Sequence, residues 1–370
     1  MHKGLRTWVE IDSKAVKHNI AVFRSVISKK TKLMAIVKSN AYGHGLWDFA
    51  KLANKNVDWF GVDSITEGLT LRKHGIKKPI LVLGYTLPEM FADAVKNDIS
   101  ITISSADGMN VVLTYKLPVK IHLKIDTGMH RQGFNISELK KACKILQNTK
   151  MVVEGMYTHF ASAKNPSFPK ETNEQLGLFN EAIKVVEDAG FKPIKHASAT
   201  GGTLLFPQAH YDLVRVGIGL YGMWPSKDTM RAMENKIELK PVLSWKTVIG
   251  EVKILPEGGG VGYDATEKLS PRSKIAICPI GYWHGYVRAF SSIGNILVRG
   301  ERAKIIGRIS MDMIVIDITK IKGVKAGDEV VIIGKQAKNK ISADELADIS
   351  GTINYEVVTR INPLIKRIIV

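Results

Sequence analysis

Lys38 offers the clearest chemistry in the sequence, because it directly follows the apolar run 34–37. A lysine at the end of a strand is ordinarily a solvated tip. In the mouth of a barrel, by contrast, its stem is buried and its amine is partly desolvated. Desolvation lowers the pKa of a lysine and makes its amine a nucleophile for carbonyl groups. The position therefore suits Schiff-base chemistry with a carbonyl substrate or a carbonyl cofactor.

A second group of residues suits a phosphate. Ser198 follows the apolar run 194–197 and offers a hydroxyl, and Gly217-Ile218-Gly219 follows the run 213–216 and offers backbone N–H groups. Small residues there let the backbone approach a phosphate closely. Lysine and phosphate cradle together favour an enzyme that uses pyridoxal 5'-phosphate (PLP) over an aldolase.

These residues follow elements that alternate regularly in the first two thirds of the chain. Short apolar runs span residues 33–37, 59–62, 80–83, 99–103, 119–125, 152–157, 194–197 and 213–216. Helical spacing follows most of them, for example over residues 64–74, 87–97, 137–147 and 174–189. Eight such alternations predict an α/β fold with a TIM-type (β/α)8 barrel, whose functional groups lie at the C-terminal ends of the strands. An open dinucleotide-binding sheet would need a glycine fingerprint after its first strand, and the sequence has none there.

From about residue 239 the pattern changes to a mostly β domain. Strands are expected over residues 242–254, 274–280, 294–298, 303–306, 314–318 and 329–333, and a helix over 342–349 with Ser342 as its cap. We therefore divide the chain into a barrel domain, residues 1–238, and a β-rich C-terminal domain, residues 239–370. The run 7–11 precedes the barrel, and we expect it to pair with the sheet of the C-terminal domain.

Composition excludes several classes of protein. The chain has 370 residues, 45% of them hydrophobic, and only two cysteines, which argues against a disordered chain and a disulfide-built secreted domain. Cys143 and Cys278 have no partners at the spacing of a zinc site. No signal peptide or apolar window of about 18 residues is present, so we expect a cytoplasmic protein. The net charge of +18 makes a basic nucleic-acid-binding protein a remote alternative, but the basic residues are scattered.

The segment 34–45, MAIVKSNAYGHG, resembles the PLP-lysine motif of the alanine racemases, a family of fold-type III PLP enzymes. Further segments resemble that family in the same order, namely KIDTGMHRQGF, THFASA, VRVGIGLYGMWP, VGYDAT, GYWHGY, GRISMDM and INYEV. The resemblance extends from residue 34 to residue 357. It implies an enzyme that interconverts L-alanine and D-alanine and supplies D-alanine for the peptidoglycan of the bacterial cell wall.

The resemblance also implies a role for each matching residue. Lys38 would bind PLP as a Schiff base and act as one catalytic base, with Tyr263 as the second. The phosphate would be bound by Tyr42, Ser198, Gly217, Ile218 and Tyr355. Around the ring, Arg215 would face the pyridine nitrogen, Arg131 the phenolic oxygen and the substrate, and His159 would pack against the ring. The substrate carboxylate would meet the backbone N–H of Met311. The corridor that leads to the site would be lined by Tyr282, Arg288, Arg308 and Asp312.

Of these residues, Arg215 has the clearest consequence for the reaction mechanism. An arginine keeps its proton in a protein, so a pyridine nitrogen opposite it stays unprotonated and the cofactor is a weak electron sink. Racemisation needs only one proton removed and one returned on opposite faces, here by Lys38 and Tyr263. Because a tyrosine has an ordinary pKa of about 10, neighbouring cations must stabilise its phenolate, and His159 and Arg215 are the candidates. The alternative for Tyr263 is a turn aromatic after the glycine-rich segment 258–262.

Tyr263 belongs to the C-terminal domain and Lys38 to the barrel. The resemblance implies a head-to-tail homodimer in which each C-terminal domain completes the partner's active site. An approach of the two residues within one chain is the alternative that sequence alone leaves open.

Lys124 is a finer hypothesis. The resemblance makes it a candidate for carbamylation, which would replace a repulsion from Arg131 by an attraction. The alternative is an unmodified barrel lysine that pairs with a carboxylate.

Some positions depart from the family pattern. Ala197 stands where Asn usually precedes the phosphate serine, Ser39 and Ser310 replace the common Ala and Cys, and the segments 282–286 and 360–363 are unusual. These departures leave the substrate range open. A racemase of the same fold that acts on serine, lysine or several amino acids is therefore the nearest alternative.

Overall fold

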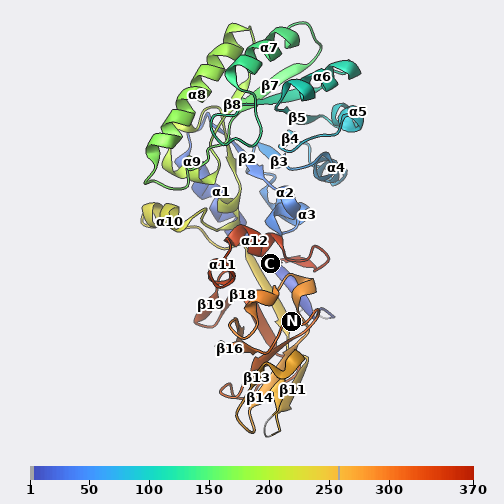
Figure 1. Cartoon of the computed structure of the whole chain (residues 1–370), viewed down its shortest axis with the longest axis vertical. Helices are drawn as coiled ribbons and strands as arrows, with labels where there is room; N and C mark the ends of the chain where they lie inside the picture. The colour runs from blue at the N-terminus through green and yellow to red at the C-terminus, as the bar shows by residue number, and fades with distance from the viewer. Residues whose placement is uncertain (1–3, 257–258) are drawn as a thin grey trace. The chain divides into compact units, whose positions relative to one another are not determined.

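The chain forms two compact units in a computed structural model that describes residues 4–256 and 259–370. One unit comprises Lys14–Ala41 and Phe49–Lys240, and the other comprises the described residues of Met1–Ser13, Tyr42–Asp48 and Pro241–Val370. Figure 1 shows the order of their elements along the chain. The domain boundary at residues 238 and 239 stays a prediction.

The first unit is built on eight parallel strands, which confirms the predicted barrel. They are β2 (Lys32–Ile36), β3 (Trp59–Val62), β4 (Ile80–Val82), β5 (Ile99–Ile103), β6 (Lys120–Lys124), β7 (Val152–Tyr157), β8 (Ile194–His196) and β9 (Leu213–Val216). Each strand pairs with the next from β2 to β8, and β9 pairs with β2. Between β8 and β9 the barrel is closed by two backbone hydrogen bonds, from Asp212 to Lys195 and from Arg215 to Ser198.

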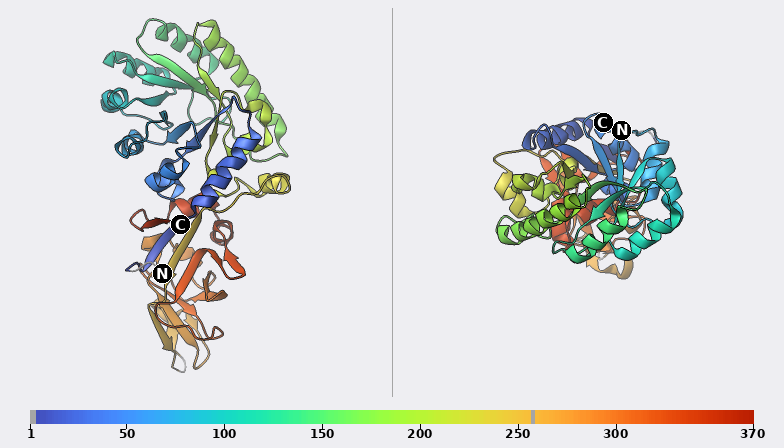
Figure 2. Two further views of the ribbon diagram at one scale, coloured as in Figure 1. Left: turned by 180° about the vertical axis from the view of Figure 1, so that it is seen from behind. Right: turned by 90° about the horizontal axis from the view of Figure 1, so that it is seen from above.

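Helices lie outside these strands, as the view from above in Figure 2 shows. The helices are α1 (Ser13–Val26), α3 (Leu46–Ala53), α4 (Ile65–Lys73), α5 (Phe91–Lys96), α6 (Ala106–Tyr115), α7 (Ile136–Leu146), α8 (Pro169–Asp188), α9 (Thr200–Leu205) and α10 (Lys227–Met233). Short 3-10 turns are η1 (Pro88–Met90), η2 (Pro207–Ala209) and η3 (Ile218–Tyr221). Side-chain caps fix several starts, including Ser64 for α4 and an Asn135–Glu138 capping box for α7.

The second unit is mostly β, as predicted. Its main sheet has the order β11-β14-β17-β16-β15-β18-β10-β1-β20, and β19 pairs with β18. The strands are β1 (Thr7–Ile11), β10 (Leu243–Val248), β11 (Glu251–Ile254), β14 (Lys274–Cys278), β15 (Asn295–Val298), β16 (Glu301–Ile306), β17 (Ile314–Asp317), β18 (Glu329–Gln336), β19 (Asn339–Ile341) and β20 (Arg367–Ile369). A small hairpin joins β12 (Gly260–Val261) to β13 (Glu267–Lys268), and β1 pairs antiparallel with β10.

Two expectations for the second unit were wrong. The strand expected over 242–254 is two strands, because the chain changes partners at Ile249 and Gly250: β10 pairs with β18 and β1, whereas β11 pairs with β14. Besides α11 (Ala343–Ser350), the unit has a second helix, α12 (Asn354–Thr359). Its Val-Val-Thr sequence favours a strand, so packing overrides propensity there. In the described part of the chain no helix is long and apolar enough to span a membrane.

Candidate active site

The turn after β2 is held in an unusual backbone conformation. It is α2 (Lys38–Tyr42), in which Ser39, Asn40 and Ala41 have φ of 51–55° and ψ of 44–53°. This left-handed conformation costs roughly 1–2 kcal/mol for each residue with a Cβ, so the surroundings must enforce it. A carboxylate does so from α4, where Glu67 accepts hydrogen bonds from the backbone N–H groups of Asn40 at 3.2 Å and Asp63 at 2.9 Å.

Lys38 begins this turn at the C-terminal end of β2. Its side chain is 39% exposed, and its Nζ lies 3.5 Å from Oδ1 of Asp63. The amine is thus accessible at the mouth of the barrel, with a carboxylate beside it. Its stem is less buried than the sequence led us to expect.

Arg215, in β9, is 3% exposed and has no carboxylate partner among the described residues. Its Nη1 donates to Nδ1 of His196 at 2.9 Å, and its Nη2 donates to the carbonyls of Thr158 and Ala197 at 2.7 and 2.8 Å. The guanidinium lies 5.0 Å from the ring centroid of Tyr157. Within the described residues these bonds use only the two terminal nitrogens of Arg215, and its Nε–H makes no hydrogen bond.

His159 follows β7 and lies beside Arg215, with Nδ1 3.4 Å from Nη2. Burial, together with the charges of Arg215, Arg131 and two lysines, lowers the pKa of His159 to about 3. The imidazole is therefore neutral. That His159 is one of the cations that stabilise a tyrosine phenolate stays a prediction, and the nearby cations count against it because they repel its proton.

Lys124 ends β6 and is 6% exposed. Its Nζ donates to Oε1 of Gln132 at 3.0 Å, which is an amide and not the carboxylate of the alternative hypothesis. Burial, followed by the charges of Arg131, Arg215 and Lys38, lowers the pKa of Lys124 to about 8. A lysine with this pKa has an appreciable neutral fraction, which is the form that reacts with carbon dioxide.

Arg131 lies in the loop between β6 and α7, and it is exposed. Asp126 shapes this loop, because its Oδ1 accepts hydrogen bonds at 3.0 Å from the backbone N–H groups of residues 128, 129 and 130. Although burial opposes ionisation of Asp126, these bonds hold its pKa below the ordinary value. The carboxylate of Asp126 therefore fixes the backbone of the loop directly before Arg131.

Two hydroxyls lie close to the predicted phosphate cradle. Ser198 is fully buried, and its Oγ donates to the carbonyl of Ala209 at 2.8 Å. Thr200, at the start of α9, instead lies under the glycine turn: its Oγ1 accepts from the N–H groups of Gly217 at 3.2 Å and Gly219 at 3.4 Å. The two N–H groups thus converge on one hydroxyl at the end of β9, and a phosphate would compete with that hydroxyl for them. Sequence reasoning missed Thr200, although it lies only two residues beyond Ser198.

Ile218 follows this cradle as the first residue of η3 and is buried. In the second unit, Tyr42 and Tyr355 form a pair with ring centroids 5.9 Å apart, and burial raises the pKa of Tyr355. Both hydroxyls predicted to bind the phosphate are thus brought together there.

Tyr263 begins the turn η4 (Tyr263–Ala265) and is 64% exposed. The next residue, Asp264, forms an ion pair with Arg308. The turn follows Gly262, which has φ of 72° and ψ of −167°, whereas Gly258 of the glycine-rich segment lies outside the described residues.

The remaining predicted residues lie in nearby loops of the second unit. Met311 and Tyr282 are exposed, and Arg288 begins the 3-10 turn η6 (Arg288–Phe290). Asp312 lies 4.0 Å from Nδ1 of His284, in η5 (Tyr282–His284). The backbone joins these segments, because the N–H of Tyr282 donates to the carbonyl of Ser310 at 3.1 Å.

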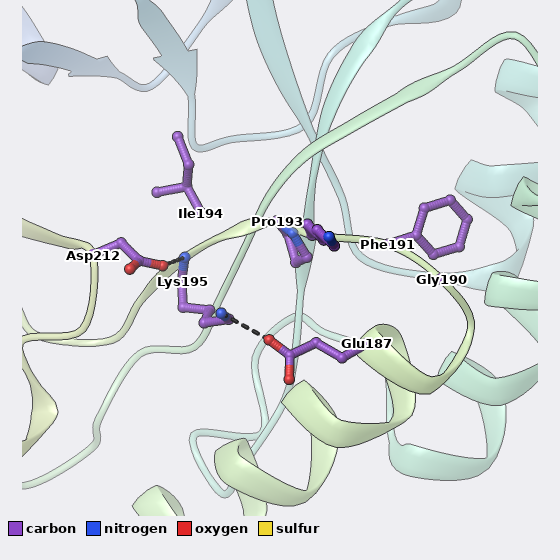
Figure 3. A pocket seen from close by; sticks show the side chains of 8 residues that line it. Glu187, Gly190, Phe191, Pro193, Ile194, Lys195 and Asp212 are labelled. Carbon is purple, nitrogen blue, oxygen red and sulfur yellow. Dashed lines mark hydrogen bonds and ion pairs between the residues drawn. The ribbon is translucent and has the colours of Figure 1, made fainter.

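A hollow of about 470 Å³ lies at the opposite end of the barrel, around the start of β8 (Figure 3). It is lined by Glu187, Gly190, Phe191, Lys192, Pro193, Ile194, Lys195 and Asp212. Lys195 pairs with Glu187 at 2.8 Å, and its backbone N–H donates to Asp212 at 2.8 Å. Lys195, Glu187 and Asp212 are therefore already paired, and the N-terminal ends of barrel strands are where stability rather than chemistry is found.

Comparison with known proteins covers nearly the whole chain. The family model "Alanine racemase, N-terminal domain" matches residues 11–225, and "Alanine racemase, C-terminal domain" matches residues 242–369. The alanine racemase of Leptospira interrogans serogroup Icterohaemorrhagiae serovar Lai is 40% identical over 372 residues, which cover 98% of this chain and 96% of the relative. That of Methanococcus maripaludis is 40% identical over 369 residues, 98% of each chain.

Solved structures agree. The crystal structure of alanine racemase from Bacillus anthracis with bound L-Ala-P has a TM-score of 0.94 and 33% identity, and the match covers 99% of this chain and 95% of that chain. The alanine racemase of Clostridium difficile 630 in complex with cycloserine has a TM-score of 0.90 and 32% identity, with 99% and 96% coverage.

Proposed function

The chain belongs to the alanine racemase family and interconverts L-alanine and D-alanine, and we propose that it does so with PLP bound at the C-terminal ends of the barrel strands. The observation that carries the cofactor assignment is the buried Arg215. Its terminal nitrogens donate only to neutral acceptors, and its Nε–H has no acceptor among the described residues. When bound, PLP supplies the electron sink that makes the α-proton of alanine removable.

The residues of the barrel fit this cofactor. Lys38 would bind it covalently, Arg215 would donate to its pyridine nitrogen, His159 would pack against its ring, and Arg131 would face its phenolic oxygen and the substrate. In the cradle, the N–H of Ile218 would bind the phosphate, together with the N–H of Gly217 once it leaves Oγ1 of Thr200. The geometry favours Thr200 over Ser198 for the hydroxyl, because Ser198 already donates to a carbonyl in a buried place. The hydroxyls of Tyr42 and Tyr355 complete the proposed set.

Two bases would move the proton. Lys38 would take or return it at one face of the α-carbon and Tyr263 at the other, while the backbone N–H of Met311 binds the carboxylate of alanine. Because His159 is neutral, Arg215 is the remaining candidate for stabilising the phenolate of Tyr263. Arg215 also keeps the ring nitrogen unprotonated, which limits side reactions.

The modification of Lys124 is part of the same proposal. Its amine has a pKa of about 8 and stands among cations that disfavour its protonation. A carbamate at this place would carry a negative charge and would orient Arg131 by attraction.

We further propose a head-to-tail homodimer with shared sites. The second unit exposes Tyr282, Trp283, Met311 and Met313, and backbone hydrogen bonds hold their two segments together. A cluster of exposed apolar side chains indicates an interaction surface. In the dimer, Tyr282, Arg288, Arg308 and Asp312 would line the corridor to the site.

Subunit complementation tests the shared site. Lys38→Ala and Tyr263→Phe are each expected to abolish racemisation. Mixing the two unfolded variants and refolding them should restore roughly one quarter of the wild-type rate, because half of the random two-fold dimers then hold one intact shared site. No recovery, or a fully active monomer in sedimentation at assay concentration, would contradict the proposal.

One assay tests the activity and the cofactor. The purified protein should show visible absorption that borohydride abolishes, with the reduced adduct on Lys38 in a peptide map. Circular dichroism should then show loss of optical activity with L-alanine, faster than with L-serine or L-lysine. Lys170→Met serves as the control, since Lys170 is an exposed lysine of α8 that pairs with Glu174 at 3.9 Å. Absence of a chromophore would refute the cofactor, and faster loss with lysine would change the substrate.

The cellular role follows from the product. We propose that the enzyme supplies D-alanine for peptidoglycan in the cytoplasm, a compartment that suits the two buried free thiols, Cys143 and Cys278. Depletion of the protein in its host should make growth depend on added D-alanine. Growth without it would argue for a catabolic role.

A further inference from the structure

A series of buried polar side chains runs from Arg215 into the barrel, and only its first member has a role in the function proposed above. Nη1 of Arg215 lies 2.9 Å from Nδ1 of His196, and Nε2 of His196 lies 2.9 Å from Nδ1 of His122. Nε2 of His122 lies 3.3 Å from Oε2 of Glu154. Both imidazoles are fully buried, and the carboxylate is mostly buried. We call these four residues the polar chain.

Hydrogen-bond chemistry allows one arrangement of protons along the polar chain. A guanidinium only donates, so Nδ1 of His196 must be unprotonated. The ring proton of His196 is then on Nε2, and it is donated to Nδ1 of His122. For the same reason the ring proton of His122 is on Nε2, from which it is donated to Glu154. A second proton on either imidazole would place two donors face to face.

The strands depart from regularity to accommodate the end of the polar chain. Ile121 pairs with Val153, but His122 pairs with Gly155, so Glu154 is an extra residue in β7. Such a bulge changes the direction of a side chain. A Cβ on Gly155 would collide with the imidazole of His122, so the glycine leaves room for the ring. Two local irregularities thus serve the same contact between His122 and Glu154.

Aromatic rings and burial keep the two histidines neutral. The ring of Tyr157 stacks on His196 with centroids 4.8 Å apart, and Trp59 meets His122 edge-on at 5.5 Å. Burial lowers the pKa of both histidines, and the charge of Arg215 lowers both further. Burial also opposes ionisation of Glu154, but hydrogen bonds from His122 and Ser100 hold its pKa below the ordinary value.

We propose that His196, His122 and Glu154 are positioning residues that fix the guanidinium of Arg215 against the ring nitrogen of the bound cofactor and hold it as a permanent donor. The identity of the cofactor rests on the function proposed above, whereas the proton arrangement does not. A guanidinium that moves away would let the ring nitrogen take a proton from water. The cofactor then becomes a stronger electron sink, which favours the side reaction in which alanine becomes pyruvate and its amino group passes to the cofactor. The polar chain therefore favours racemisation over amino-group transfer.

The first test uses the free protein and no cofactor. After labelling with ¹⁵N-histidine, NMR should show His196 and His122 as neutral Nε2–H tautomers from about pH 5.5 to 8.5, in contrast with an exposed histidine of ordinary pKa near 6.5. Their resonances are identified among the ten histidines by their loss in His122→Phe and His196→Phe. An Nδ1–H tautomer or an imidazolium at either position in this range would overturn the polar chain.

The second test measures the partition of the loaded enzyme between two products. In Glu154→Leu, which leaves the Nε2–H of His122 without an acceptor, the ratio of racemisation to pyruvate formation should fall about tenfold or more, while KM for alanine stays within about twofold. Glu154→Gln, whose amide oxygen still accepts, should restore the ratio. Ser100→Ala is the matched control, because it removes the other hydrogen bond to Glu154 and leaves the histidines paired.

The outcomes separate this inference from the proposed function. An unchanged ratio in Glu154→Leu, in a folded variant with an altered NMR tautomer, would overturn the positioning role. If wild-type protein bound no PLP, the proposed function would fail, and the NMR result would still decide the proton arrangement.

Discussion

Lys124 should form a carbamate with carbon dioxide at neutral pH. Its pKa of about 8, against an ordinary value of 10.5, gives a neutral amine fraction of ~20% at about pH 7.4, compared with ~0.1% for an ordinary lysine. The reactive form is therefore enriched about 200-fold. The charges of Arg131, Arg215 and Lys38 repel an ammonium and would attract a carbamate, whereas burial, the largest cause of the shift, disfavours either charged form.

The pH dependence follows from the sign of this shift. The folded chain holds the charged amine below about pH 8 at a cost of about 3 kcal/mol, since each pKa unit corresponds to about 1.4 kcal/mol. Between pH 8 and 10.5 the unfolded chain binds more protons than the folded chain, so the cost disappears as pH rises through this window. Carbamate formation, which requires the neutral amine, should accordingly increase with pH and approach its maximum above about pH 8.

The assay is ¹³C NMR of the protein in ¹³C-bicarbonate. A carbamate carbonyl resonance is expected in wild type at about pH 8 and should disappear in Lys124→Met. Lys120→Met is the control, because Lys120 starts the same strand and its hydrogen bond with Asp98 raises its pKa, so that it stays protonated. A wild type without this resonance, or a resonance that persists in Lys124→Met, would refute the reasoning.

Three further predictions concern the surroundings of Lys38 and of the cradle. Gly43→Ala should lower the free energy of unfolding by roughly 1–3 kcal/mol more than Gly75→Ala. Both glycines have positive φ, but only a Cβ at residue 43 would collide with backbone atoms. Equal losses of stability in urea unfolding would contradict this. Glu67→Ala should destabilise the protein by about 1–3 kcal/mol and slow racemisation, because the N–H groups of Asn40 and Asp63 lose their acceptor. An unchanged rate would show that the left-handed turn keeps its conformation without Glu67. Thr200→Val should weaken PLP binding by about tenfold in a fluorescence titration, whereas Ser198→Ala should change it by less than about threefold. The reverse order would show that Ser198 binds the phosphate.

The sequence predicted the barrel well because of how parallel strands are buried. Such strands are covered on both faces and read as unbroken apolar runs. The runs at 59–62, 99–103, 152–157 and 213–216 accordingly coincide with β3, β5, β7 and β9. In the second unit, where strands change partners within one apolar stretch, the run 242–254 did not reveal the break at Gly250. A break of this kind depends on long-range pairing with Ile277, which no local pattern contains.

The details of the site depended on information that is not local. The left-handed turn 39–41 contains no glycine, and only Asn40 is of a residue type that tolerates positive φ well. The support for the turn comes from Glu67 on another element. Ser198 and Thr200 are only two residues apart at the start of α9, but their hydroxyls point to different partners. Ser198 contacts the carbonyl of Ala209, and Thr200 contacts the N–H of Gly217. Resemblance to a family supplied the type of residue, and which of the two hydroxyls binds a phosphate stays a prediction.

The same electrostatic arrangement accounts for several features of the barrel mouth. Arg215, Arg131 and Lys38 are cations around one place, and they lower the pKa of both Lys124 and His159. Gathered cations beside neutral histidines suit the anions proposed above, namely the phosphate of the cofactor, a carbamate on Lys124 and the carboxylate of alanine. The cost of holding these cations together is then offset only when the anions are present, so the mouth is most stable in its loaded form. The total charge of +18 contributes little to this argument, because the charges that matter are the few whose distances the barrel strands fix.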